Sequence, residues 1–204
     1  MIASPSGYVL RDKYRANSRT KNLGSLILFV VSLCALLYLN LLFRPEFKAF
    51  EFARRVLLEG EVLTSLRITL IAVIAVAIIY VYGLVHEALH GGLFWIFTKR
   101  RPNFGRKGLN LYTTLPIGVY CTRNKTIVAA LGPLIIITVL CFILWLMVPL
   151  DVVPAMILLI SVNIAACISD ILQFSWLLRF SGKSLFGFHG QDSVIYEPQD
   201  IGHE

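Results

Sequence analysis

Long runs of apolar residues, separated by polar and basic segments, dominate this chain. Four such runs cover residues 24–43, 68–97, 126–150 and 153–180. A helix needs about 20 apolar residues, at 1.5 Å per residue, to cross the hydrocarbon core of a bilayer. The pattern therefore predicts four transmembrane helices. The first run follows a basic segment, as in a signal peptide, but it exceeds the 7–15 residues of a signal-peptide core, and we interpret it as a retained span.

The segments between the runs differ in character. Residues 44–67 mix aromatic, apolar and charged positions, which predicts an interfacial amphipathic helix. Residues 99–125 hold seven Lys and Arg and no acidic residue. The centre of this basic segment, GLNLYTTLPIGVY, is rich in Gly, Pro and β-forming residues, so we expect it to be extended or to form a hairpin.

The expected fold is an all-α integral membrane protein with about four transmembrane helices. A short membrane-associated extended or hairpin segment joins the second span to the third. We expect a basic cytoplasmic N-terminal segment at 1–23, a membrane-embedded domain at 24–180 with its core at 68–180, and a polar, solvated tail at 181–204.

Composition and charge support a membrane location. The chain of 204 residues is 57% hydrophobic and 15% charged, against about 25% charged residues in ordinary soluble domains. This excludes a typical cytosolic enzyme, a disordered chain and a disulfide scaffold. The net charge of +7 comes from basic residues that flank the apolar runs, so the lipid bilayer, and not nucleic acid, is the expected partner.

The distribution of Lys and Arg also predicts the topology. If both termini are cytoplasmic, the cytoplasmic segments hold fourteen Lys and Arg and the opposite side holds five. The positive-inside rule favours this arrangement. We therefore expect a multi-pass protein of the cell membrane with both termini in the cytoplasm.

The end of the second run carries the sequence HEALH, an H-E-x-x-H motif. On a helix, His86 and His90 lie one turn apart on the same face, so both imidazoles can bind one zinc ion. Glu87 lies beside them and can act as a general base toward water at the metal. The alternative is that the motif is an ordinary polar helix end outside the bilayer.

A catalytic zinc site needs a third protein ligand. Asp170 is the only acidic residue in the fourth run. Because the second and fourth spans cross in the same direction, we expect Asp170 to reach the depth of the histidine pair and to be the third ligand. A proton-relay or helix-packing role for this aspartate stays open.

Four other residues carry side chains that could take part in binding or catalysis. Asn163 precedes Asp170 by two helical turns and could bind the substrate or stabilise an oxyanion, although an interhelical hydrogen bond is an equal alternative. We expect Cys167 to be a packing residue, and His189 and His203 to be solvated.

These residues resemble those of a known family. HEALHGG, AALGPLIII and NIAACISD are similar to the active-site segments of intramembrane zinc metalloproteases of the site-2 protease type, and the whole pattern resembles the bacterial "putative zincin peptidase" family. The Phe104-Gly105 element belongs to this likeness, which covers residues 68–180. Two features depart from it: Asp170 is not followed by Gly, and no Pro lies between Asn163 and Asp170.

The resemblance implies that His86, His90 and Asp170 are the zinc ligands, that Glu87 is the base and that Asn163 positions the substrate. It also implies that GLNLYTTLPIGVY pairs as a strand with an unwound substrate. The leading hypothesis is a zinc metalloendopeptidase that cleaves membrane-associated proteins or peptides near the cytoplasmic leaflet.

Two alternatives remain from the sequence. One is a non-catalytic membrane protein whose metal site is structural or serves sensing or transport, with Cys167 or a tail histidine as a fourth ligand. The other is an inactive homologue that binds membrane partners. The oligomeric state is not predicted.

Overall fold

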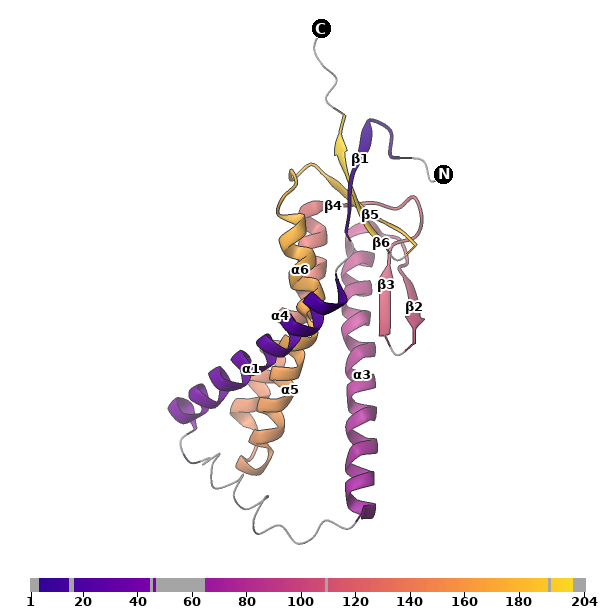
Figure 1. The fold of residues 1–204 in the computed structure, drawn as a ribbon. Helices are drawn as coiled ribbons and strands as arrows, with labels where there is room; N and C mark the ends of the chain where they lie inside the picture. Colours follow the sequence, from indigo (N-terminus) through magenta and orange to yellow (C-terminus); the bar gives the residue numbers. More distant parts are fainter. Residues whose placement is uncertain are drawn as a thin grey trace.

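The computed structural model describes residues 4–14, 17–44, 46, 65–108, 110–190 and 192–199. Helices make up most of this part of the chain (Figure 1). They are α1 (Ser18–Phe43), α3 (Ser65–Thr98), α4 (Arg123–Met147), the short 3-10 helix η2 (Leu150–Val152), α5 (Val153–Ala166) and α6 (Ile168–Leu177).

Four stretches of helix are long and apolar enough to cross a membrane, as the sequence predicts. They are Ser18–Phe43, Val76–Thr98, Arg123–Met147 and Val153–Leu177. Many large apolar side chains on these helices are exposed, for example Val30, Ile79 and Val139. Apolar surface of this extent is stable in lipid and not in water. The predicted interfacial helix at 44–67 lies largely outside the described residues.

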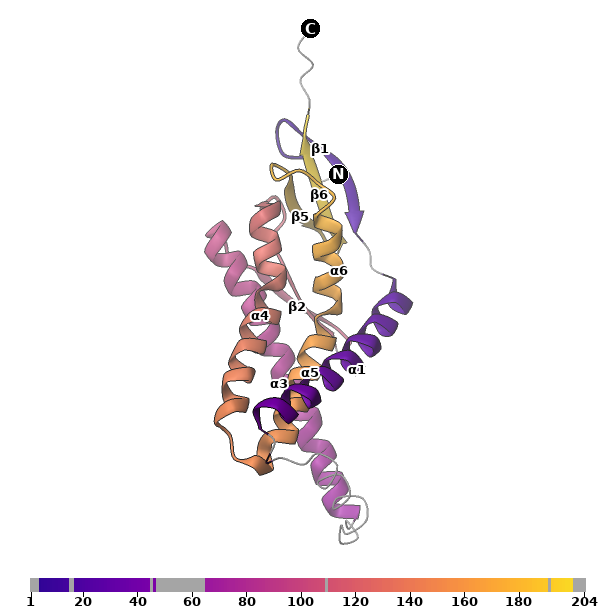
Figure 2. The same ribbon diagram turned by 90° about the vertical axis from the view of Figure 1, so that its left-hand side faces the viewer.

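The helices pack around an apolar core that joins α1, α4 and α5. In Figure 2, α1 crosses α5 obliquely. Leu36, Ile137, Trp145 and Ile160 are buried in this core. At the end of α1, the Arg44 side chain donates hydrogen bonds to two carbonyl groups at the end of α4, at 2.7 and 2.8 Å, which satisfies carbonyls that a helix end leaves without partners.

The fourth span, predicted over 153–180, is present as Val153–Leu177, which is long and apolar enough to cross a membrane. It consists of two helices and not of one continuous helix. Cys167 separates α5 from α6 with a ψ of 8°, far from the helical value of about −42°. The break creates a new helix N-terminus inside the apolar span. Asp170 lies in the first turn of α6, where the positive end of the helix dipole favours a carboxylate.

The basic segment between α3 and α4 forms a β-hairpin, which confirms the sequence prediction. Strand β2 (Asn103–Lys107) pairs antiparallel with β3 (Asn110–Thr114). Figure 1 shows the hairpin beside α3. The hydroxyl of Thr113 donates a hydrogen bond to the backbone carbonyl of Glu87 at 3.0 Å. The hairpin is thus attached directly to the helix of the HEALH motif.

A second sheet corrects the all-α prediction. Four antiparallel strands form it in the order β1-β6-β5-β4. Their bounds are β1 (Tyr8–Tyr14), β4 (Cys121–Thr122), β5 (Leu185–His189) and β6 (Asp192–Pro198). The expectation of a solvated tail is therefore wrong, because Phe186, Val194 and Ile195 are fully buried. The strands from the two ends of the chain pair with each other, and β5 also pairs with β4 from the middle of the chain.

The sheet lies at one end of the helices and packs on them through a second apolar core (Figure 1). Phe94 of α3, Trp176 and Leu177 of α6, and Phe186 and Ile195 of the sheet contribute to it. Because β1 pairs with β6, the described ends of the chain lie on the same side of the helices. The sheet also ties the C-terminal ends of α3 and α6 together, one to two turns beyond the candidate site.

Candidate metal centre

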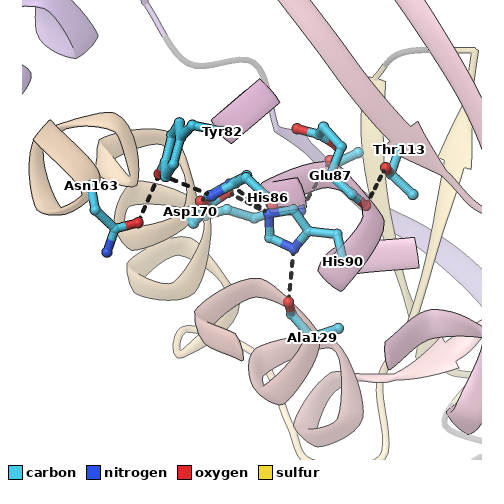
Figure 3. Close-up of polar contacts among 10 residues, drawn as sticks. Tyr82, His86, Glu87, His90, Thr113, Ala129, Asn163 and Asp170 are labelled. Carbon is cyan, nitrogen blue, oxygen red and sulfur yellow. Dashed lines mark hydrogen bonds and ion pairs between the residues drawn. The ribbon is translucent and has the colours of Figure 1, made fainter. Parts of the chain in front are cut away.

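The two histidines of HEALH lie on one face of α3, as the spacing predicts, and both are buried. Their Nε2 atoms are 3.1 Å apart. Asp170 of α6 is also buried; its carboxylate oxygens lie 3.3 Å from His86 Nε2 and 3.5 Å from His90 Nε2. Figure 3 shows the three side chains converging from the two helices. The structure thus brings together the three residues that the sequence nominates as ligands.

The spacing of these donor atoms suits a metal ion. Zinc bonds of 2.0–2.1 Å in tetrahedral geometry hold the ligand atoms about 3.3–3.4 Å apart. The two Nε2 atoms are 3.1 Å apart, and each faces a different oxygen of Asp170, with His86 3.3 Å from Oδ2 and His90 3.5 Å from Oδ1; all three separations lie around that value. Oδ2 of Asp170 is buried and has no hydrogen-bond donor within the described part of the chain. A cation between the three side chains would satisfy this oxygen, so the residues present fit a zinc ion.

The outer nitrogen of His90 is held by the backbone. His90 Nδ1 lies 2.8 Å from the carbonyl oxygen of Ala129 in α4. A carbonyl only accepts, so Nδ1 carries the proton and Nε2 presents its lone pair toward Asp170 and His86. Hydrogen bonds of this kind fix the tautomer and ring orientation of metal-binding histidines.

The outer nitrogen of His86 is held by side chains. Its Nδ1 lies 3.3 Å from the hydroxyl of Tyr82, one turn earlier on α3. The same hydroxyl donates a hydrogen bond of 2.7 Å to Oδ1 of Asn163 on α5, and the amide of Asn163 donates to Thr138 at 2.8 Å. With its own proton directed at Asn163, Tyr82 accepts from His86 Nδ1, which leaves Nε2 unprotonated. Both histidines therefore present Nε2 lone pairs to the same point (Figure 3).

The contacts of Asn163 bear on its expected role. Its side chain is fully buried and bonded to Tyr82 and Thr138, which matches the interhelical alternative that the sequence left open. A direct contact with the substrate stays a prediction.

Glu87 lies next to the histidine pair. One of its carboxylate oxygens lies within 4.8 Å of donor nitrogens of His86 and His90, and its side chain is half-buried. A carboxylate in this position can accept a proton from a water molecule that occupies the open side of the site.

Cys167 is buried, as expected of a packing residue, whereas His189 differs from expectation. Cys167 is fully buried at the break between α5 and α6, and its Sγ lies within 4.8 Å of donor atoms of His86 and Asp170. His189, expected to be solvated, forms a hydrogen bond within the sheet: its Nε2 lies 2.7 Å from the hydroxyl of Tyr196. His203 lies outside the described residues.

Comparison with protein families agrees with the geometry. The model of a family described as "putative zincin peptidase" matches residues 78–186. The chain belongs to this family. The matched region holds both histidines, Glu87, the hairpin, α4 and Asp170, and thus every part of the candidate metal centre described above. Neither a curated protein nor a solved structure gives a match. Membership of a zincin peptidase family indicates a metallopeptidase and implies zinc as its metal.

Sequence reasoning did not find two parts of this candidate metal centre, namely Tyr82 and the Ala129 carbonyl. Tyr82 precedes His86 by the same four residues that separate His86 from His90, so all three share one helix face. That spacing was a usable signal. The sequence held no signal for the Ala129 carbonyl. This backbone group is 39 residues away from His90 along the chain and becomes its partner only because α3 packs against α4.

Proposed function

We propose that this protein is an intramembrane zinc metalloendopeptidase that hydrolyses peptide bonds of membrane-associated proteins or peptides. The observation that supports the proposal best is the cluster of His86 Nε2, His90 Nε2 and the Asp170 carboxylate, with separations of 3.1–3.5 Å between helices that are long enough to span a membrane. These three side chains would be the zinc ligands. They leave one position of a tetrahedral ion for water or substrate, as catalytic zinc sites do.

The proposed chemistry divides between the ion and Glu87. Zinc held by the three residues would polarise the scissile carbonyl group and make the attacking water more acidic. Glu87 accepts the proton of that water as it attacks and then delivers the proton to the nitrogen of the leaving amine. The hydrogen bonds from His86 and His90 to their outer partners keep both rings oriented during the reaction.

The surroundings of the site support an apolar, membrane-derived substrate. An apolar groove of about 450 Å³ lies between α3, α4 and α5. Its walls include Val81, Val85, Ile137 and Leu159, and Tyr82, which contacts His86, forms part of it. The β2–β3 hairpin lies on another side of α3, and we propose that it offers backbone pairing to a locally unwound substrate, since a membrane helix has no free backbone groups of its own.

We also propose that the protein resides in the cell membrane with both termini in the cytoplasm. The pairing of β1 with β6 supports a common side for the two ends, and the excess of Lys and Arg on that side supports the cytoplasm.

Metal content tests the ligand set. Detergent-purified wild-type protein, prepared with zinc and without chelators, should hold about one zinc per chain. His86→Ala and Asp170→Ala should each lose most of it, whereas His189→Ala, whose histidine lies in the sheet, should retain it. Zinc at the wild-type level in Asp170→Ala would remove this residue from the ligand set, and a zinc-free wild type would overturn the metallopeptidase proposal.

Loss of the proposed base tests the reaction. Glu87→Gln should keep zinc and lose cleavage. New peptide N-termini in membranes of cells that express the wild type, compared with membranes of cells that express Glu87→Gln, would reveal both activity and substrates. Identical sets of N-termini from the two strains would contradict the peptidase proposal.

A structural metal site is the second candidate function. The observation that favours it is the proximity of Cys167 Sγ to donor atoms of His86 and Asp170, within 4.8 Å. A fourth protein ligand would close the site to water. X-ray absorption of the zinc-loaded protein distinguishes the candidates, because a sulfur neighbour at about 2.3 Å that disappears in Cys167→Ser indicates a closed site.

A further inference from the structure

The Ala129 carbonyl that holds His90 belongs to the middle of α4. Inside a helix, the carbonyl of residue i normally accepts the N–H of residue i+4. For Ala129 that residue is Pro133, which lies within α4. Proline has no N–H, so the helix offers the Ala129 carbonyl no partner from this position.

His90 takes the place of the missing donor. Its Nδ1 lies 2.8 Å from the Ala129 oxygen, a normal length for a strong hydrogen bond. The proline ring also disfavours a carbonyl at i−4 that points straight along the helix axis. Both effects make this carbonyl available to a group from outside α4.

Small residues let His90 reach the carbonyl. Ala129 and Ala130 are buried in the contact between α3 and α4. Gly132 lies so close to α3 that a Cβ atom placed on it would be 2.1 Å from Cδ1 of Leu93. The two helices can therefore approach closely, and Ala129, Gly132 and Pro133 act together in one turn of α4.

We propose that Pro133 is a positioning residue of the metal centre: by withholding an N–H from the Ala129 carbonyl, it reserves that carbonyl for His90 and so fixes the tautomer and orientation of this ligand. The inference rests on the proposed function, because His90 needs an unprotonated Nε2 only if it binds metal. Pro133 acts only through the Ala129 carbonyl and His90, without contact with the metal position.

The test is the zinc affinity of Pro133→Ala, measured by competition with a chelator. Alanine restores an N–H that competes with His90 for the Ala129 carbonyl. Weakened outer contacts of a metal ligand lower affinity by 10- to 100-fold, and we expect a loss near tenfold. Thermal stability of the metal-free protein should stay equal or rise, because proline is a poor residue in a helix interior. A merely structural proline would give the opposite pattern, with stability lost and affinity kept.

Two further variants separate the missing N–H from other effects. Pro154→Ala, at the start of α5 where an N–H has no helical partner, should leave zinc affinity unchanged. A backbone ester at position 133, introduced as an α-hydroxy acid, also lacks the N–H and should restore the wild-type affinity.

The outcomes distinguish this inference from the proposed function. Suppose that the wild type binds zinc, that His90→Ala loses zinc and that Pro133→Ala binds zinc as tightly as the wild type. The role proposed for Pro133 is then wrong, and the metal site stands. If the ester variant binds as weakly as Pro133→Ala, the missing N–H is not the cause. If the wild type binds no zinc, the proposed function itself fails.

Discussion

The hydroxyl of Tyr82 donates a hydrogen bond of 2.7 Å to Oδ1 of Asn163. This bond joins the helix of HEALH to α5, just before the break that positions Asp170. Because the same hydroxyl lies 3.3 Å from His86 Nδ1, the orientation of a proposed metal ligand depends on the packing of two helices.

Tyr82→Phe should weaken zinc binding without unfolding the protein. The variant removes the acceptor for His86 Nδ1–H and leaves Oδ1 of buried Asn163 without its donor. We expect zinc affinity to fall about tenfold, as for other outer contacts of metal-binding histidines. Tyr80→Phe is the matched control, since Tyr80 is exposed on the same helix. Equal zinc affinity in the two variants would show that the Tyr82 contact does not support the ligand.

Thr113→Val should loosen the hairpin from the HEALH helix. The substitution keeps the shape of the side chain but deletes the hydrogen bond to the Glu87 carbonyl, which is worth about 1 kcal/mol. Hydrogen exchange of the amides in β2 and β3 should become faster while zinc content is unchanged. Thr114→Val, a neighbouring buried position, provides the comparison, and faster exchange in that variant alone would contradict the assignment.

The two glycines after HEALH should respond differently to alanine. A Cβ on Gly91 would lie 2.4 Å from the ring of Phe104 in β2, whereas a Cβ on Gly92 would meet nothing within 4 Å. Gly91→Ala should push the ring of Phe104 away from α3 and lower stability by about 1 kcal/mol. Gly92→Ala should be neutral or stabilising, because alanine favours a helix. Thermal unfolding of both variants measures the difference, and equal melting temperatures would exclude close packing at Gly91.

Tyr14 should ionise only at high pH. Its hydroxyl is buried without a hydrogen-bond partner in the described residues, and its ring packs on Trp176. In the metal-free protein, burial, and then the negative charge of Asp170, raise the pKa of Tyr14 above its usual value near 10.

The sign of the resulting pH dependence follows from this shift. Well below pH 10 the Tyr14 phenol is neutral in both the folded and the unfolded state, so it contributes no pH dependence. Above pH 10 the unfolded chain loses the proton first, and stability falls as pH rises toward the folded pKa. Tyr14→Phe should flatten this alkaline loss of stability. A pH titration of the absorbance near 295 nm, with the Tyr14→Phe curve subtracted from that of the wild type, should show one phenolate that forms only above pH 10. A midpoint at or below pH 10 would contradict the prediction.

The helical part of the site was predictable from the sequence because its signals are local. Runs of apolar residues have the length of a bilayer crossing, and the i,i+4 spacing alone places His86 and His90 on one face. Gly and Pro within the basic segment indicated the hairpin. Asp170 was a candidate ligand because it is the only acidic residue in its run. The expectation that the second and fourth spans run in the same direction placed it level with His86 and His90.

Only the tertiary structure decided the rest. The sheet pairs β1 with β6, which are separated by most of the chain. Such pairing leaves no local pattern in the sequence, so the short strands at both ends were predicted to be solvated segments. The break at Cys167 and the contacts of Tyr82 with Asn163 and of His90 with Ala129 depend on how helices pack. The sequence by itself determined which side chains could bind a metal, because residue type and helical spacing are local properties. The packing of distant segments determined their orientation, because each hydrogen-bond partner comes from another part of the chain.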